Sequence, residues 1–154
     1  MARALIVGFG NPLRSDDGLG WHIAQQLARD LSPSNVEVIA TQQLTPEISE
    51  AVSRAEQVLF VDAANTGEPG TLQCEQLLPS ASPSRHSHDL SPALILMMAN
   101  ELYGCCPPAY LLTIAGDSFE AGNTMSPAVI AAIPAMIAEI KGRIDRDGKS
   151  GRSD

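Results

Sequence analysis

The chain has 154 residues, 44% of them hydrophobic and 18% charged, with 10 Lys and Arg against 18 Asp and Glu. This length predicts one domain with a hydrophobic core of its own. The formal net charge of −8 argues against binding to nucleic acid or to an anionic membrane surface, because both need clustered basic side chains. No apolar run approaches the roughly 18 residues of a membrane span, and an odd number of cysteines is a poor disulfide framework, so we expect a cytoplasmic protein.

Short apolar segments alternate along the chain with longer segments of helical spacing. In chain order we expect a strand at 4–7, a helix at about 17–31, a strand at 36–40, a helix opening at 45–47, a strand at 58–61, an edge strand at 71–77, a helix from 91 to about 102, a strand at 109–114 and a last helix from 126. The helices follow from apolar residues at every third or fourth position and from Ser-Pro or Thr-Pro pairs, which cap a helix and fit its first turn. The strands are continuous apolar runs, which are typical of parallel strands buried on both faces.

This alternation predicts an α/β fold. We expect a three-layer, mostly parallel twisted sheet of about five strands, with helices on both faces and an antiparallel strand at one edge. Residues 1–144 form a single domain in this prediction, and residues 145–154 form a flexible C-terminal tail. A doubly wound order such as 2-1-3 places the first and third strands side by side, and open α/β sheets bind ligands in the crevice at the carboxyl ends of such strands.

Acidic side chains follow both of the strands that border this crevice. The loop after the first strand reads GFGNPLRSDDGLG from Gly8 to Gly20, and the third strand ends directly in Asp62. If these strands are adjacent, Asp62 and the Asp16-Asp17 pair converge, with His86 or His88 available from the loop before the helix at 91. Two carboxylates and one imidazole form a site that suits divalent metal ions of hard to intermediate character.

Other interpretations of the same residues are open. Asp16 is predicted to be the N-cap of the helix that follows it. Gly8 and Gly10 after a strand match the start of a dinucleotide motif, but its third glycine is replaced by Leu13, and carboxylates would repel a pyrophosphate. No nucleophilic triad is indicated, because the Cys105-Cys106 pair has no assigned base.

The motifs together resemble those of the hydrogenase maturation endopeptidases. That family opens with a strand and a GxGNxLxxDDGxG-like motif, which is complete here from Gly8 to Gly20. Its further marks are an apolar strand that ends in Asp, a histidine shortly before a helix, and a characteristic segment leading into the last helix. These correspond to Asp62, to His88 and to residues 116–127, so the resemblance covers about residues 3–140.

The resemblance implies a function. Members of this family remove a short C-terminal peptide from the large subunit of nickel-iron hydrogenases after nickel has been inserted, and the bound nickel is thought to be the recognition feature. Carried over by position, the metal ligands and catalytic residues are Asp17, Asp62 and His88, although some members have Glu in place of Asp17. The family therefore implies a metal-guided, aspartate-dependent endopeptidase.

The resemblance also sets expectations for the metal and the partner. The Ni²⁺ is supplied by the precursor, with other divalent metals able to occupy the site in vitro, and Arg14 is a candidate contact for the terminal extension. The partner is the hydrogenase large-subunit precursor, with no nucleic acid and no membrane, and we expect a monomer. Two alternatives stay open: whether a metal-activated water or a carboxylate base leads the attack, and whether the protein is instead a nickel-dependent docking chaperone that does not cleave.

Overall fold

The computed structural model describes residues 4–31, 35–81 and 90–150. Within these residues, five strands form one sheet in the order β2-β1-β3-β5-β4. The strands are β1 (Ala4–Phe9), β2 (Val36–Thr41), β3 (Gln57–Ala64), β4 (Leu72–Leu77) and β5 (Ala109–Ala115). β1 pairs in parallel with β2 and β3, β3 pairs in parallel with β5, and β4 runs antiparallel to β5 at the edge. The predicted mostly parallel sheet, its 2-1-3 order and its antiparallel edge strand are therefore confirmed.

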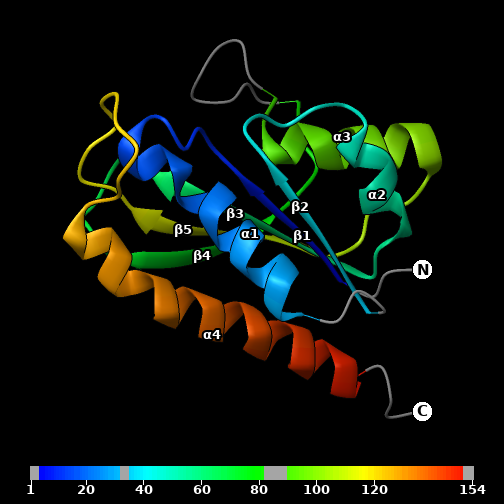
Figure 1. Ribbon diagram of the computed structural model, residues 1–154. Coiled ribbons are helices and arrows are strands. Elements are labelled where there is room, and N and C mark those ends of the chain that lie inside the picture. The colour runs from blue at the N-terminus through cyan, green and yellow to red at the C-terminus, as the bar shows by residue number, and fades with distance from the viewer. Residues whose placement is uncertain (1–3, 32–34, 82–89, 151–154) are drawn as a thin grey trace.

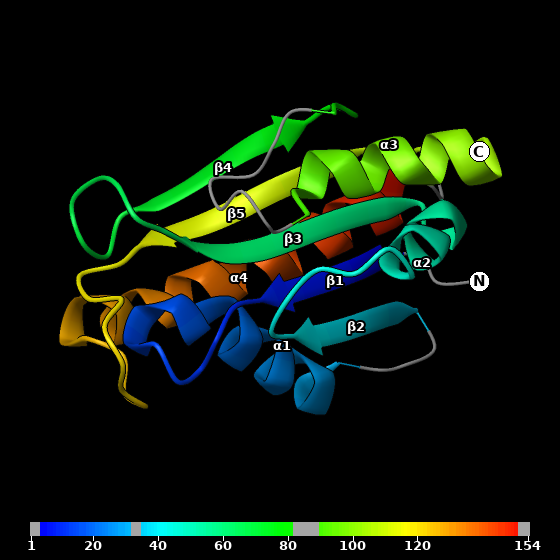
Figure 2. The same cartoon turned by 90° about the horizontal axis from the view of Figure 1, so that it is seen from above.

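Helices cover both faces of this sheet (Figures 1 and 2). One face carries α1 (Leu19–Asp30), which follows a short 3₁₀ helix η1 (Ser15–Gly18), and α4 (Pro127–Ser150). The other face carries α2 (Ile48–Arg54) and α3 (Pro92–Tyr103). Across the described residues, no helix has both the length and the apolar character that crossing a bilayer requires.

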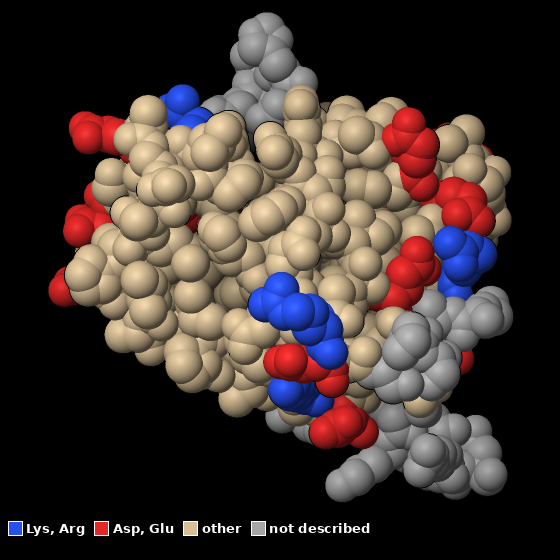
Figure 3. Space-filling view, in the orientation of Figure 1, with Lys and Arg blue, Asp and Glu red and all other residues tan. Residues whose placement is uncertain are grey.

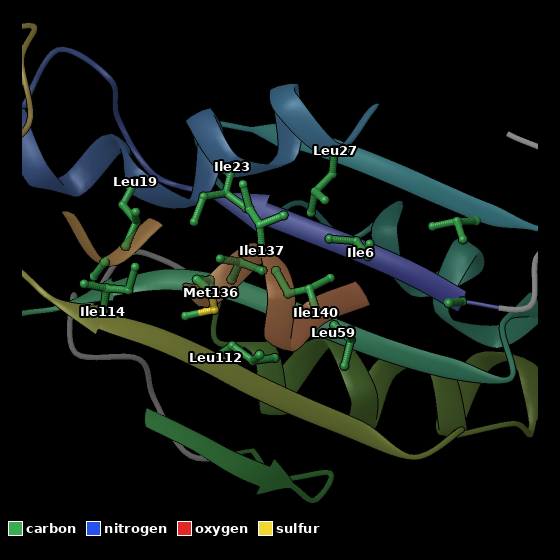
Figure 4. Close-up of a cluster of buried hydrophobic side chains, with 14 of the residues drawn as sticks. Ile6, Leu19, Ile23, Leu27, Leu59, Leu112, Ile114, Met136, Ile137 and Ile140 are labelled. Atoms are coloured by element: carbon green, nitrogen blue, oxygen red, sulfur yellow. The ribbon is translucent and has the colours of Figure 1, made fainter. Parts of the chain in front are cut away.

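Two layers of apolar side chains fill the spaces between the sheet and its helices. Successive β1 residues point to opposite faces, so Ile6 packs in the layer under α1 and α4, and Leu5 packs in the layer under α2 and α3. Figure 4 shows the first layer, where Ile23 of α1 and Ile140 of α4 lie over the sheet. Full burial of one Leu or Ile side chain stabilises by about 1.5–3 kcal/mol, so this packing holds the helices in place.

Three element boundaries differ from the sequence expectations. β3 continues through Asp62 to Ala64, because residues 62–64 still pair with β5, so Asp62 lies within the strand and not at its end. The helix expected from residue 17 starts as η1 and becomes α-helical only at Leu19. α4 runs past residue 144 to Ser150, so the segment expected to be a flexible tail begins inside a helix, and residues 151–154 lie outside the described residues.

The sequence predicts that a Thr-Pro pair caps α2 and that a Ser-Pro pair caps α3, and only the second prediction is confirmed. The Ser91 hydroxyl accepts a hydrogen bond from the Leu94 N–H at 3.1 Å, and Pro92 stands in the first turn of α3, as predicted. α2 instead begins at Ile48 without a side-chain cap, so the prediction that Thr45 caps it is wrong. Thr45 contributes its backbone carbonyl, which accepts from the Ile48 N–H at 3.1 Å.

Glycine is required where α1 crosses the strands. A Cβ atom on Gly20 would collide with the carbonyl oxygen of Val61 and would lie 2.6 Å from that of Phe9. A Cβ atom on Gly8 would in turn collide with the carbonyl oxygen of Gly20. The first turn of α1 therefore rests directly on the backbones of β1 and β3, which fixes η1 beside the carboxyl ends of these two strands.

Replacing Gly20 with Ala should lower the free energy of unfolding by about 1–3 kcal/mol, because the added methyl group must displace strand backbone. Gly142→Ala is the matched control, since a Cβ atom on Gly142 in α4 meets nothing within 4 Å. Ala is favoured over Gly inside a helix by about 1 kcal/mol, so the control protein should be as stable as the wild type or slightly more stable. Urea denaturation measures both variants, and equal midpoints would contradict the close approach of α1 to the strands.

Candidate active site

Segments from four parts of the chain meet at the carboxyl edge of the parallel strands, at the left in Figure 2. They are residues 10–18 after β1, residues 41–43 at the end of β2 and just after it, the end of β3, and residues 116–126 after β5. The Gly10 N–H donates to the Thr41 carbonyl at 3.2 Å, and the Gly116 N–H donates to the Ala64 carbonyl at 2.8 Å. Because β1 and β3 are neighbours whose connections lead to opposite edges of the sheet, this is its topological switch point, where open α/β sheets bind ligands.

Asp17 lies in η1 and is half-buried. Its Oδ2 accepts a hydrogen bond from the Asn11 N–H at 2.9 Å, and its own N–H donates to the Arg14 carbonyl at 3.1 Å. The Asn11 side chain accepts from the Leu13 N–H at 2.9 Å. Gly10, with φ of 143°, passes so close to the Asp17 carbonyl that a Cβ atom would collide with it. The loop therefore folds back on itself and holds the Asp17 carboxylate through a backbone amide.

Asp62 is half-buried near the end of β3, in register with Thr113 of β5. Its Oδ1 accepts a hydrogen bond from the Ala63 N–H at 2.8 Å. η1, which carries Asp17, contacts β3. The structure thus places Asp17 and Asp62 at the same edge of the sheet, as their positions in the sequence predict.

A metal site of the predicted type needs a histidine beside these two acids. Among the residues that the structure describes, no group of three His, Cys, Asp or Glu side chains is placed to hold a metal ion. His86 and His88 lie outside the described residues. A three-ligand site formed by Asp17, Asp62 and His88 therefore stays a prediction.

The sequence also drew attention to Arg14, as a contact for the terminal extension, and to the Cys105-Cys106 pair. The structure places them at opposite ends of the parallel strands. Arg14 is exposed on the loop after β1 and forms an isolated backbone bridge with Gly122. Cys105 and Cys106 precede β5 and so lie at the amino ends of the parallel strands, away from the candidate site. Burial raises the pKa of the Cys106 thiol, and the neighbouring Cys105 adds to this shift. A raised pKa disfavours the nucleophilic thiolate, so it argues against Cys106 as a catalytic nucleophile.

Asp16 has a different role from the one that its place in the sequence suggests. Its side chain is fully buried, and neither η1 nor α1 has a side-chain cap, so the prediction that Asp16 is an N-cap is wrong. The carboxylate instead accepts four hydrogen bonds from the segment after β5. Oδ2 accepts from the N–H groups of Asp117 (2.7 Å) and Ser118 (3.0 Å) and from the Ser126 hydroxyl (2.6 Å), and Oδ1 accepts from the Ser126 N–H (2.7 Å).

These hydrogen bonds keep Asp16 ionised inside the protein. Burial by itself raises the pKa of this carboxyl, but the bonds from the Ser126 hydroxyl and from the backbone N–H groups outweigh it, so the pKa lies below its ordinary value. Sequence reasoning missed Ser126 and residues 117–118 as partners, because it identified them only as the start of the last helix and as part of the segment that leads into it. No local pattern links them to Asp16.

Replacing Asp16 with Asn should destabilise the protein at neutral pH by about 1.5–3 kcal/mol, because an amide nitrogen cannot accept the hydrogen bonds that the charged group accepts. Since the pKa is lowered in the folded state, the contribution of Asp16 is fully present above the ordinary carboxyl pKa of 3.8 and is lost as the pH falls through the folded-state pKa. Urea denaturation of both proteins from neutral to acid pH should show a stability gap that closes at the acid end. A gap that stays constant over this range would contradict the assignment.

Known proteins resemble this chain in sequence and in fold. The family model described as hydrogenase maturation protease (HycI) matches residues 21–143. Among curated proteins, no relative matches the sequence.

Three solved structures illustrate the likeness of fold. The hydrogenase maturating endopeptidase HybD from E. coli is 22% identical, with a TM-score of 0.74 over 95% of this chain and 94% of that one. The [NiFe] hydrogenase maturation protease HycI from Thermococcus kodakarensis is 20% identical, with a TM-score of 0.76 over 93% of this chain and 92% of that one. The hydrogenase 2 maturation peptidase from Thaumarchaeota archaeon SCGC_AB-539-E09 is 22% identical, with a TM-score of 0.69 over 93% of this chain and 98% of that one. At such identities the likeness shows a shared fold.

Proposed function

The chain belongs to the hydrogenase maturation protease family, and we propose which of its residues carry out proteolysis. The protein is an endopeptidase that removes the C-terminal extension of a nickel-iron hydrogenase large-subunit precursor. In our proposal the nickel already bound to the precursor is recognised by Asp17, Asp62 and His88. The metal therefore arrives with the substrate. A docking chaperone would bind the same precursor but leave its C-terminal extension in place.

The observation that carries this proposal is the placement of two acidic side chains at the switch point of the sheet. Asp17 and Asp62 are both half-buried at the carboxyl edge of β1 and β3. Carboxylate oxygens suit divalent ions, and two carboxylates with one imidazole leave coordination positions for groups of the precursor. The Asn11 N–H, 2.9 Å from Asp17 Oδ2, orients this carboxylate in the way that hydrogen bonds orient metal ligands.

Docking of the nickel brings the peptide bond of the precursor to the same carboxylates. Fixing reacting groups in one geometry can lower a barrier by roughly 7–11 kcal/mol. In the hydrolysis a water oxygen bonds to the peptide carbonyl carbon, the C–N bond breaks, and a proton from the water passes to the new amino group. The nickel activates the water or polarises the carbonyl, or else a carboxylate takes the proton of the water. We favour the metal-guided route, because the chain lacks the Asp-Thr/Ser-Gly pair of aspartic peptidases.

The surface beside the site fits a protein partner. Leu13 on the loop after β1 and Ile130 on α4 are large apolar side chains with exposed fractions of 65% and 52%. The sequence has no charged residue from 121 to 138, and Figure 3 shows a wide uncharged area over the first turns of α1 and the first half of α4. Exposed apolar surface of this kind is typical of protein–protein contacts.

Asp17→Asn and Asp62→Asn should each abolish removal of the extension from nickel-loaded precursor while the protein stays folded, because the amide keeps the shape but loses the charge that attracts the metal. His88→Ala tests the third ligand in the same way. Asp30→Asn, exposed at the far end of α1, is the matched control and should cleave at the wild-type rate. The intact mass of the precursor reports the outcome. Normal cleavage by either Asp variant would exclude that residue as a ligand.

A further inference from the structure

We propose that Asp16 is a positioning residue of the proteolytic site and that it acts through Asp17. Its buried carboxylate ties residues 116–126 to residues 10–18, and this tie fixes the direction in which Asp17 presents its own carboxylate. The inference rests on the proposed function of Asp17 as a ligand of the precursor's nickel.

Both oxygens of Asp16 are held by the same residue. The Ser126 hydroxyl donates to Oδ2 at 2.6 Å, and the Ser126 N–H donates to Oδ1 at 2.7 Å. A carboxylate held at both oxygens cannot rotate without breaking one of these bonds. Because Ser126 immediately precedes α4, Asp16 is fastened to the start of a long helix and not only to a loop.

The two segments also pair through their backbones. The Ser15 N–H donates to the Gly122 carbonyl and the Gly122 N–H donates to the Leu13 carbonyl, both at 2.9 Å, while the Ser15 hydroxyl donates to the Glu120 carbonyl at 2.8 Å. Ser15 has a φ of 54°, in the left-handed region that is unfavourable for a residue with a Cβ atom. Such a conformation persists where surrounding contacts over-determine it, and here the contacts come from the segment after β5.

The effect reaches Asp17 because the two acids are consecutive in one short turn. Asp16 bonds to Ser126, whereas Asp17 accepts the Asn11 N–H at 2.9 Å, so the two side chains leave η1 toward different partners. η1 has no side-chain cap of its own, and hydrogen bonds from the segment after β5 hold its Asp16 side chain. A rotation of the peptide that releases Asp16 also moves Asp17. Misplacing a reacting group by about 1 Å can slow an enzymatic reaction by roughly 10²-fold.

Ser126 offers a sharp test, because it is not a proposed ligand and its hydroxyl donates a short hydrogen bond to Asp16. Ser126→Ala removes that bond, and Ser126→Thr keeps a hydroxyl in its place. Ser49→Ala is the matched control, since Ser49 is also buried and its hydroxyl donates to the Pro46 carbonyl at 2.6 Å on the α2 side of the sheet. We would measure cleavage of nickel-loaded precursor, stability in urea, and the NMR signal of the Asn11 amide.

Ser126→Ala should lower kcat by about 10- to 100-fold and should shift the Asn11 amide signal, whereas Ser126→Thr should restore both. Ser49→Ala should lose stability but keep the wild-type rate and the wild-type Asn11 signal at a temperature where it is folded. These results together would support positioning, because a general loss of stability does not produce them.

An unmoved Asn11 signal in Ser126→Ala would overturn the inference. If this variant also cleaved at the wild-type rate, Asp16 would have a structural role alone. If it cleaved more slowly, the loss of activity would not be caused by a displaced Asp17. If the wild-type protein itself leaves the precursor intact, the proposed function fails. The Asn11 signal still decides in that case whether Ser126 sets the position of Asp17.

Discussion

The hydrogen bonds around the buried Asp16 carboxylate are the interaction on which the candidate site depends. An ionised carboxylate removed from water is costly unless donors replace the water, and here backbone N–H groups and the Ser126 hydroxyl do so. These donors follow β5 in the chain. The shape of the loop after β1 therefore depends on residues that follow β5 and lead into α4. A loop that is short in sequence takes its geometry from the whole fold.

The close approach of backbones at Gly8 and Gly20 is the second constraint. It lets α1 rest on β1 and β3, and so it carries η1 to the switch point of the sheet. There the two consecutive acids divide their roles. The charge of Asp16 is compensated within the protein, whereas Asp17 joins Asp62 at the carboxyl edge of β1 and β3. In the proposed reaction Asp17 and Asp62 therefore face the metal ion as two carboxylates. The negative charge of Asp16 is stabilised by its own hydrogen bonds and does not repel them as a third free carboxylate would.

Local signals predicted the architecture well, because uninterrupted apolar runs and Ser-Pro caps depend on neighbours in the sequence. The same signals fail where the partner is remote. Asp16 matches a helix N-cap in its local sequence, and only the placement of Ser126 in space reveals its role. A polar residue after an apolar run suggests the end of a strand, yet pairing with β5 carries β3 through Asp62. Asp17 and Asp62 could be assigned to the carboxyl edge of β1 and β3 from the sequence, because each comes after a buried apolar run. His88 lies outside the described residues.

Recognition of the nickel carried by the precursor is tested most directly by one comparison. The same precursor, with and without nickel, is incubated with the wild-type protein, and its intact mass is measured over time. We expect the nickel-loaded precursor to lose its C-terminal extension and the nickel-free precursor to keep its full mass. Removal of the extension from both forms at the same rate would contradict recognition through the metal.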